Sequence, residues 1–264
     1  MEKENEEISF TFPDNRMVPP ICYKDKRNGV ITRLQQTEIF KHNRKEYQFL
    51  RPSNVGLFVN ISLKELKLSQ NIFNKFINKK MSNSNKILFE EKELTLLYDY
   101  FEHIQTSIIF SYTAVESFSN AAIPNNFSID KINNRGILEI WDKNNIEKWY
   151  PTSQKLIEIL PLTLASNNIK NSKHWDDFLK LEIIRNEIIH LKDSDKIYNI
   201  DNSFFQKFFH KNIFRIIESG FNIIKFYSDN IKASFFIPIQ LGNKKVNIFE
   251  IDDPDNYFHL EQVK

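Results

Sequence analysis

The longest regular pattern in the chain is a helical period that begins at Glu90 and continues to Ala122. Pro124 ends it, because a proline ring disfavours helical geometry in the residue before it. A helix of about thirty residues predicts a mainly α fold. Its apolar residues recur every three or four positions, which places them on one face: Leu94, Leu97, Phe101, Ile104, Ile108, Tyr112, Val115 and Phe118.

Three further segments have helical patterns. One begins near Thr152 and contains Pro161, which we expect to kink it. Another begins near His174 or Trp175, with acidic residues in its first turn, where the helix dipole favours them. The last runs from about Ser203 to Ile231 and is apolar nearly all round, so the amino-terminal region or a second subunit must cover it beside the bundle. We therefore expect an antiparallel four-helix bundle over residues 87–232.

The two ends of the chain predict strands. Residues 1–86 read as an irregular β-containing region, although a capping pattern at Ser62 also predicts a helix to Phe76. Residues 233–264 read as a β-hairpin tail that packs on the amino-terminal region. The runs behind these expectations are Ile8–Phe12, Val30–Thr32, Tyr47–Leu50, Val55–Leu63, Phe235–Leu241 and Lys244–Ile251. A short helix is expected around Ile137 to Trp141.

Composition excludes several classes of protein. The net charge of +2 comes from 36 basic and 34 acidic residues, so any affinity for RNA must come from local patches. The single cysteine, Cys22, excludes an internal disulfide framework and suits a reducing cytosol. No apolar run approaches the ~18 residues of a membrane span, and the acidic first residues do not resemble a secretory signal. We expect a cytoplasmic protein with no membrane contact.

The segment Leu181–Lys192 combines an apolar stripe with polar residues of catalytic type. Leu181, Ile184, Ile188 and Leu191 share one helical face, which we assign to the core. Asn186 and His190 lie four apart on the opposite face, with Glu182 and Ile183 beside them and Arg185 on the flank. A His and an Arg on a surface helix are most often merely solvated, so the pattern alone is weak.

The run Arg185-Asn186-Glu187-Ile188-Ile189-His190 resembles the Arg-polar-x-x-x-His signature of the HEPN superfamily. This superfamily consists of helical-bundle domains and includes many metal-independent endoribonucleases. The earlier run from Ala114 to Asn120 is similar to an early HEPN helix, with polar residues Glu116 and Asn120 four apart. The resemblance covers roughly residues 90–232.

These residue types suit RNA cleavage through the ribose 2′-hydroxyl. His190 is a candidate for acid–base catalysis because histidine is the side chain most often used for proton transfer near neutral pH, while Arg185 offers a planar fork of donors to phosphate. Asn186 is placed to orient His190 or to hold the scissile phosphate. The resemblance implies the same roles, and implies that two such helices meet across a homodimer.

One position departs from the family pattern. In HEPN toxins paired with a nucleotidyltransferase antitoxin, a Tyr follows two residues after the His, and here that position is Lys192. Control by tyrosine modification is therefore not expected. We expect the activity to be controlled instead by an antitoxin or other regulatory protein, by the β region or by a phage signal. Lys192 is expected to add positive charge near the phosphate.

We therefore expect a homodimeric HEPN-like endoribonuclease of a toxin or anti-phage (abortive infection) system that cuts tRNA or mRNA to a 2′,3′-cyclic phosphate. Arg185, Asn186 and His190 are its candidate catalytic residues, with Glu116, Asn120 and Lys192 in support.

No cofactor or metal is expected, because the histidines lack metal-ligand spacing. His103 reads as a structural histidine and His174 as part of a helix cap. The alternative function is a non-catalytic HEPN-like RNA-binding or sensor subunit of a larger complex, which the basic segment 41–45 and the apolar last helix favour. Such a basic segment is otherwise a solvated turn.

Overall fold

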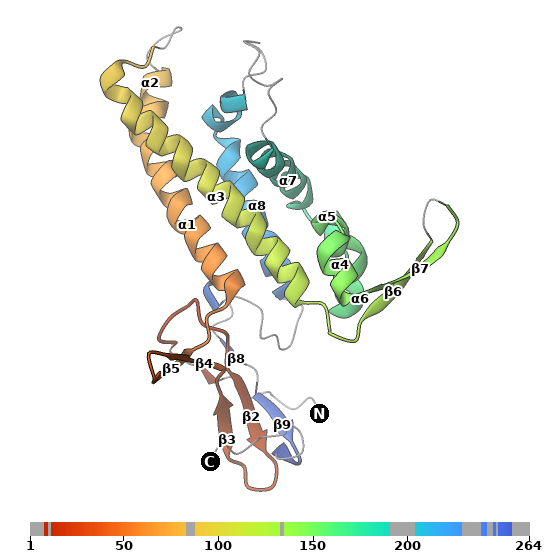
Figure 1. The fold of residues 1–264 in the computed structure, drawn as a ribbon. Coiled ribbons are helices and arrows are strands. Elements are labelled where there is room, and N and C mark those ends of the chain that lie inside the picture. The colour runs from red at the N-terminus through yellow and green to blue at the C-terminus, as the bar shows by residue number, and fades with distance from the viewer. Residues whose placement is uncertain are drawn as a thin grey trace, which may run out of the picture.

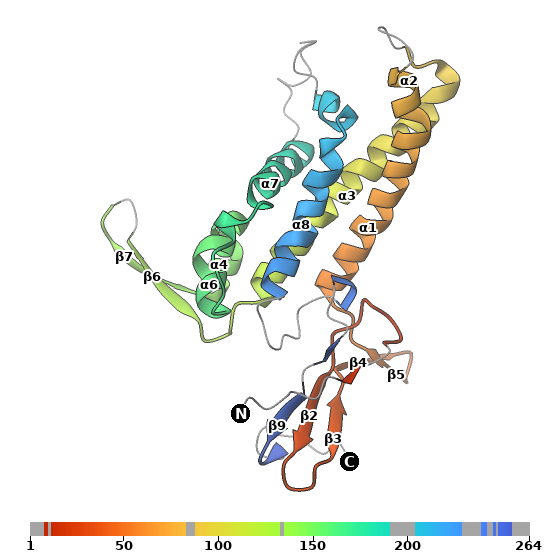
Figure 2. The ribbon, with the colours of Figure 1, turned by 180° about the vertical axis from the view of Figure 1, so that it is seen from behind.

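The computed structural model describes residues 8–9, 12–82, 88–132, 135–190, 204–228, 239–241, 245–246 and 248–254. It is mainly helical, as expected. Its longest described helices lie side by side and alternate in direction along the chain (Figure 1). Seen from behind, a small β region lies beyond one end of them (Figure 2). These helices are α1 (Asn54–Ile72), α3 (Leu94–Ala121), α7 (Trp175–Ile189) and α8 (Asn212–Ser228).

The strand expected over Val55–Leu63 is wrong, because these residues lie in helix α1. Ser53 caps it by accepting a hydrogen bond from the backbone of Gly56 at 3.2 Å, nine residues before the cap expected at Ser62. Its buried positions recur every three or four residues, so the helical period prevails over the β-branched composition. They are Val55, Gly56, Val59, Ser62, Leu66 and Ser69. The helical bundle thus begins within the range 1–86.

Helix α1 packs closely along α3. The Ser62 hydroxyl donates to the carbonyl of Ser107 at 2.8 Å, and the Ser107 hydroxyl donates back to the carbonyl of Ser62 at 2.9 Å. Small side chains allow the two backbones to approach, and the reciprocal bonds satisfy the buried hydroxyls. Beyond α1 the chain passes through π-helix η1 (Phe73–Ile77) and α2 (Asn78–Ser82), and 3-10 helix η2 (Glu91–Glu93) leads into α3.

The last expected helix is divided into two elements. Residues Phe204–Phe209 form 3-10 helix η7, and α8 begins only at Asn212. The buried Tyr100 hydroxyl donates to the carbonyl of Phe208, which holds η7 against α3. Helix α8 then packs against both α3 and α7. In the described part of the chain, no helix combines the length and apolar character needed to cross a membrane.

Gly220 lies where α8 crosses α3 with almost no space between them. A Cβ atom placed on it would lie 2.3 Å from the Ser111 hydroxyl oxygen and 3.3 Å from a methyl carbon of Leu181. The Ser111 hydroxyl is itself fixed, because it donates to the carbonyl of Ile217 at 2.7 Å. A side chain at position 220 therefore cannot be accommodated without breaking this bond or separating the helices.

We expect Gly220→Ala to lower the free energy of unfolding by about 1–3 kcal/mol. Helix propensity alone would make the alanine variant about 1 kcal/mol more stable, so a loss of stability can come only from the packing conflict. Urea denaturation measures it. The double variant Ser111→Ala/Gly220→Ala removes the closest clashing atom and is expected to recover part of the loss. A Gly220→Ala protein as stable as the wild type would contradict this close approach.

The segment between α3 and α7 is irregular. A hairpin of β6 (Ser128–Ile132) and β7 (Leu138–Asp142) replaces the short helix expected around Ile137 to Trp141. Pro161 lies in the first turn of a short α-helix that directly follows a π-helical turn. It has no N–H, and the Asn168 side chain donates to the carbonyl of Ile157 at 3.0 Å instead. The remaining elements are α4 (Lys143–Trp149), α5 (Thr152–Gln154), π-helix η3 (Lys155–Ile159), α6 (Leu160–Thr163) and 3-10 helix η4 (Ile169–Asn171).

The β region joins both ends of the chain. Strand β2 (Ile21–Asp25) pairs antiparallel with β3 (Ile31–Leu34) and parallel with β9 (Ile248–Ile251). The expected pairing of the tail with amino-terminal strands is confirmed, but the tail hairpin is not. Ile239–Leu241 is 3-10 helix η8, and residues 235–238 lie outside the described part. The other strands are β1 (Ile8–Ser9), paired with β8 (Lys245–Val246), and β4 (Thr37–His42), paired with β5 (Lys45–Leu50).

Candidate catalytic site on helix α7

Helix α7 uses its apolar stripe as expected. Leu181 and Ile184 are buried, and Ile188 packs against the core from a partly buried position. Leu191, the last member of the stripe, lies outside the described residues, as does Lys192. Because this face is held by the core, the orientation of the remaining side chains of α7 is fixed.

Arg185 faces α3 and is half-buried. Its guanidinium carbon lies 4.8 Å from the centre of the Tyr112 ring, a cation–π arrangement. Its Nη1 donates to the side-chain oxygen of Asn186 at 2.9 Å. Its Nε is buried and has no hydrogen-bond partner within the described part of the chain. The structure therefore brings Arg185 and Asn186 together, with donor capacity on Arg185 that no described group uses.

Tyr112 supports this arrangement from α3. Its hydroxyl donates to the carboxylate of Glu182 at 2.8 Å, and its ring stacks on Phe178 at 6.0 Å. Burial raises the pKa of Tyr112, and the Glu182 carboxylate raises it further, so the hydroxyl stays protonated at neutral pH. Glu182, which we expected on the exposed face, is partly buried because Tyr112 holds it. Tyr112 therefore carries Arg185 on its ring face and Glu182 on its hydroxyl.

His190 lies at the carboxyl end of α7 rather than within it. Its backbone N–H donates to the carbonyl of Asn186 at 2.9 Å, but its φ of −120° and ψ of 42° leave the helical region. The helical-wheel angle between Arg185 and His190 therefore does not describe their separation. The imidazole is exposed. Among the described residues, the side-chain hydrogen bond of Asn186 goes to Arg185, so the expected orientation of His190 by Asn186 is not seen.

Glu116 and Asn120 lie at a different level of the bundle. Helices α3 and α7 run in opposite directions (Figure 1), so Asn120 is about two turns, roughly 12 Å, beyond Tyr112, on the side away from His190. Both residues face Lys155 of η3. Its Nζ donates to the side-chain oxygen of Asn120 at 2.7 Å and to the carbonyl of Glu147 at 2.9 Å.

Lys155 is a residue that sequence reasoning missed. It is 1% exposed, and burial lowers its pKa, while the nearby carboxylates of Glu116 and Glu147 oppose that shift. One sequence pattern could have indicated a buried polar partner. Polar residues recur every four positions on α3, and such a row requires polar groups on the facing segment: Tyr112, Glu116 and Asn120. Glu116 and Asn120 thus belong to the surroundings of a buried lysine, one or two turns from Arg185.

The chain matches no family model, no curated protein and no solved structure at a significant level.

Other candidate positions are accounted for separately. His103 bonds to the carboxylate of Glu65 at 2.5 Å, which confirms it as a structural histidine. His174 precedes α7 in the N-cap position, but its side chain makes no capping bond. Within the described residues, no group of His, Cys, Asp or Glu is arranged to hold a metal.

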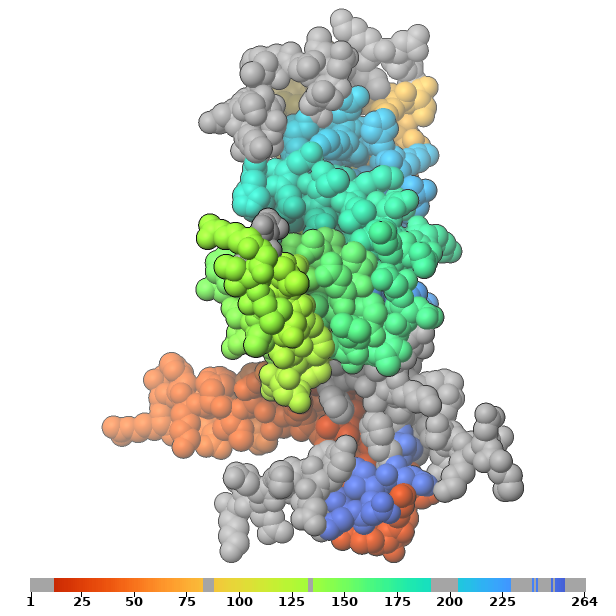
Figure 3. Space-filling view, turned by 90° about the vertical axis from the view of Figure 1, so that its right-hand side faces the viewer, coloured from red at the N-terminus to blue at the C-terminus, as the bar shows by residue number. Residues whose placement is uncertain are grey.

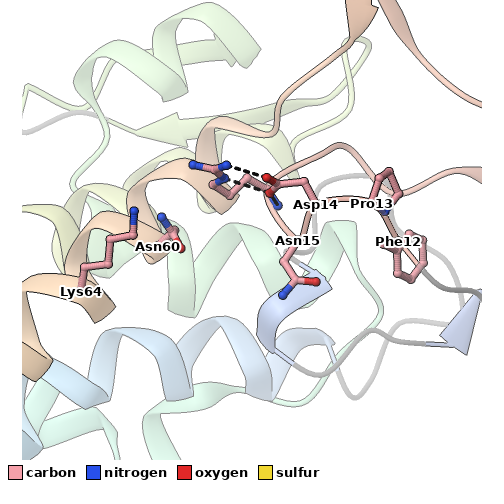
Figure 4. A pocket seen from close by; sticks show the side chains of 7 residues that line it. Phe12, Pro13, Asp14, Asn15, Asn60 and Lys64 are labelled. Carbon is pink, nitrogen blue, oxygen red and sulfur yellow. Dashed lines mark hydrogen bonds and ion pairs between the residues drawn. The ribbon is translucent and has the colours of Figure 1, made fainter.

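An open cleft of about 400 Å³ lies where α1 meets the β region (Figure 4). The guanidinium of Arg16 is already paired with Asp14, because its Nε donates to the Oδ1 of Asp14 at 2.8 Å. No residue of α7 lines this cleft. Its lining residues are Phe12, Pro13, Asp14, Asn15, Arg16, Asn60 and Lys64.

The α7 site has the properties of an anion site beside a titratable group. A planar guanidinium stacked on a ring keeps its charge and presents donors along its edge, which matches the oxygens of a phosphate. An exposed imidazole at the end of the same helix is accessible to a ribose hydroxyl. The arrangement suits phosphodiester chemistry that needs one cation and one acid–base group.

Proposed function

We propose that the chain is a HEPN-like, metal-independent endoribonuclease. The observation that carries the proposal is Arg185, held over Tyr112 and bonded to Asn186 at the end of α7 that terminates in the exposed His190. The resemblance of residues 185–190 to the HEPN signature and the antiparallel helices around α7 support the same assignment.

The proposed step is an internal transesterification of RNA. The ribose 2′-oxygen attacks the adjacent phosphorus while His190 accepts its proton, and the 5′-oxygen leaves with a proton from an acid. The products are a 2′,3′-cyclic phosphate and a 5′-hydroxyl. Arg185 binds the phosphate oxygens, whose charge grows in the transition state, and Asn186 keeps the guanidinium in position.

The proposed active form is a homodimer, in which the second copy supplies the second imidazole as the acid. Ile183 is 57% exposed on α7, an apolar residue on the face that also carries Asn186. Such a side chain is suited to a covered position, so we place the two-fold axis near it. We further propose a role in a toxin or anti-phage (abortive infection) system, with tRNA or mRNA as substrate and an antitoxin or regulatory protein as partner. Lys192 would add charge to the cleft.

The function is tested by incubating the purified chain with tRNA and mRNA in excess chelator. We expect cleavage to continue, and the upstream fragments to carry 2′,3′-cyclic phosphates that acid converts to monophosphates. Intact RNA under these conditions would contradict the proposal that the chain is an endoribonuclease. Cleavage that stops in chelator, or fragments ending in 3′-hydroxyls, would contradict the metal-free mechanism.

A second candidate function is a non-catalytic RNA-binding or sensor subunit. The observation that favours it is that no described side chain orients the His190 imidazole, since the Asn186 oxygen bonds to Arg185. A catalytic base is usually held by a neighbouring group. The same assay separates the two candidates, because RNA binding without cleavage is the expected behaviour of the sensor.

A further inference from the structure

Strands β4 and β5 form a two-stranded ribbon that pairs with no other described strand. The ribbon comprises residues 37–50, and it projects sideways from the body of the molecule (Figure 3, orange). Its turn is Asn43-Arg44, both with positive φ (48° and 61°), as in the tight turns that match the twist of a hairpin. The basic segment 41–45 is therefore a hairpin tip, as its reading as a turn predicted.

One face of the ribbon is aromatic. Because side chains alternate along a strand, the paired positions Phe40 and Tyr47 share a face with Phe49. The rings of Phe40 and Tyr47 are stacked, with centroids 4.9 Å apart and an angle of 11°, and Phe49 meets Phe40 edge-on at 6.1 Å. The three side chains are 49%, 41% and 44% exposed. An isolated ribbon gains little by exposing three rings, which indicates that a ligand covers them.

The hairpin tip at the end of the ribbon is basic. It carries Lys45 on the aromatic face, Arg44 in the turn and Lys41 on the opposite face, and it has no acidic residue. The nearest carboxylate pairing is Lys41 to Glu46 at 3.8 Å, between two well-exposed side chains, so it does little to neutralise the tip. Glu38 is engaged by Arg51 at 3.0 Å. Stacked rings with cations at one end match the bases and phosphates of a single strand of nucleic acid.

We propose that the β4–β5 ribbon binds single-stranded RNA, with bases stacked on Phe40, Tyr47 and Phe49 and phosphates at the basic tip. The choice of RNA over other single strands rests on the proposed function, whereas the aromatic and basic surface stands independently. The ribbon then captures unpaired RNA, and the site on α7 acts on it.

The test is fluorescence anisotropy with labelled single-stranded oligouridylate and His190→Ala protein, so that binding is measured whether or not the chain cleaves RNA. The variants Phe40→Leu and Tyr47→Leu keep an apolar cross-strand pair but remove the π-faces. We expect each to weaken binding roughly tenfold. Tyr98→Leu is the control, since Tyr98 is an aromatic of α3 that is 55% exposed, at least as much as the ribbon residues, and this variant should bind as the parent does.

Charge is tested with Lys41→Gln/Arg44→Gln/Lys45→Gln, which should reduce the slope of log K against log salt by about two. A parent protein that does not bind, ribbon variants that bind equally well, or equal affinity for duplex RNA would each overturn the proposal. So would a loss of self-association in the Leu variants with unchanged RNA affinity, because the ribbon would then join two copies of the chain. Binding by the wild-type chain that leaves the RNA uncleaved would leave this inference standing and refute the endoribonuclease proposal.

Discussion

His190→Ala is expected to reduce RNA cleavage by roughly 10²–10⁴-fold, the usual contribution of a positioned acid–base group. The imidazole is exposed and lies beyond the last turn of α7, so its removal should change the free energy of unfolding by less than about 0.5 kcal/mol. Single-turnover cleavage of labelled RNA, beside urea denaturation of the same preparation, measures both quantities.

His210→Ala is the matched control, because His210 is also an exposed histidine next to a helix of the bundle. It should cleave RNA at the rate of the wild type. Equal losses in the two variants, or no loss in His190→Ala, would remove His190 from the proposed mechanism.

Mixing wild-type chains with an excess of His190→Ala chains tests whether the site is shared between copies. Because the proposed cleft uses one imidazole from each copy, a heterodimer that holds a single native His190 should be inactive. The cleavage rate per wild-type chain should therefore fall as His190→Ala chains are added, whereas the same excess of His210→Ala chains should not lower it. Arg185→Lys keeps the charge but loses the planar fork, and should itself be strongly impaired. A rate that His190→Ala chains do not lower, or a wild-type monomer that cleaves at full rate in sedimentation-defined conditions, would contradict the dimer.

The helical core was predictable because its periodicity is strong and uninterrupted. Most of the stripe of α3 and the residues Leu181 and Ile184 of α7 are buried where the sequence places them, while Leu94 and Phe101 pack against the core from partly buried positions. Residues 55–63 were misread because Val55, Phe58 and Val59 suggest a strand by type. Only the recurrence of buried positions every three or four residues shows the helix. Period is the better guide where composition and spacing disagree.

The surroundings of the candidate site were less predictable, because they depend on contacts between distant segments. Tyr112 reads as a core residue in sequence, and its role as the platform for Arg185 requires α3 and α7 to be adjacent. His190 leaves the helix before its wheel position is reached, which no spacing rule indicates. The burial of Lys155 also cannot be predicted from the local sequence, because Lys155 resembles any surface lysine until its partners on α3 and α4 are known.

Lys155→Met is expected to lower the free energy of unfolding by about 2–4 kcal/mol. Methionine fills much of the space of the lysine stem and avoids the burial of a charge, which is a gain. The loss is larger, because the Asn120 side-chain oxygen and the Glu147 carbonyl lose their donor and the Glu116 carboxylate loses a cation. Lys180→Met is the matched control: its ammonium is exposed, 3.6 Å from Asp177, and should contribute less than about 1 kcal/mol.

The difference in stability between wild type and Lys155→Met should also depend on pH. Burial lowers the pKa of Lys155 below its ordinary 10.5, so the unfolded chain binds more protons than the folded chain in the interval between the two values. The contribution of Lys155 to the free energy of unfolding therefore rises with pH through that interval and reaches its full value above 10.5. Denaturation midpoints of both proteins measured toward that pH should diverge, and parallel curves would contradict the buried charge.

The same variant decides what Glu116 and Asn120 do. Because the Lys155 cluster lies on the side of Tyr112 away from His190, folded Lys155→Met protein should cleave RNA at the wild-type rate per folded molecule. If cleavage instead falls by orders of magnitude while urea denaturation shows an intact fold, then the cluster of Lys155, Glu116 and Asn120 takes part in the chemistry. The catalytic site would then extend along α3 rather than end at Arg185.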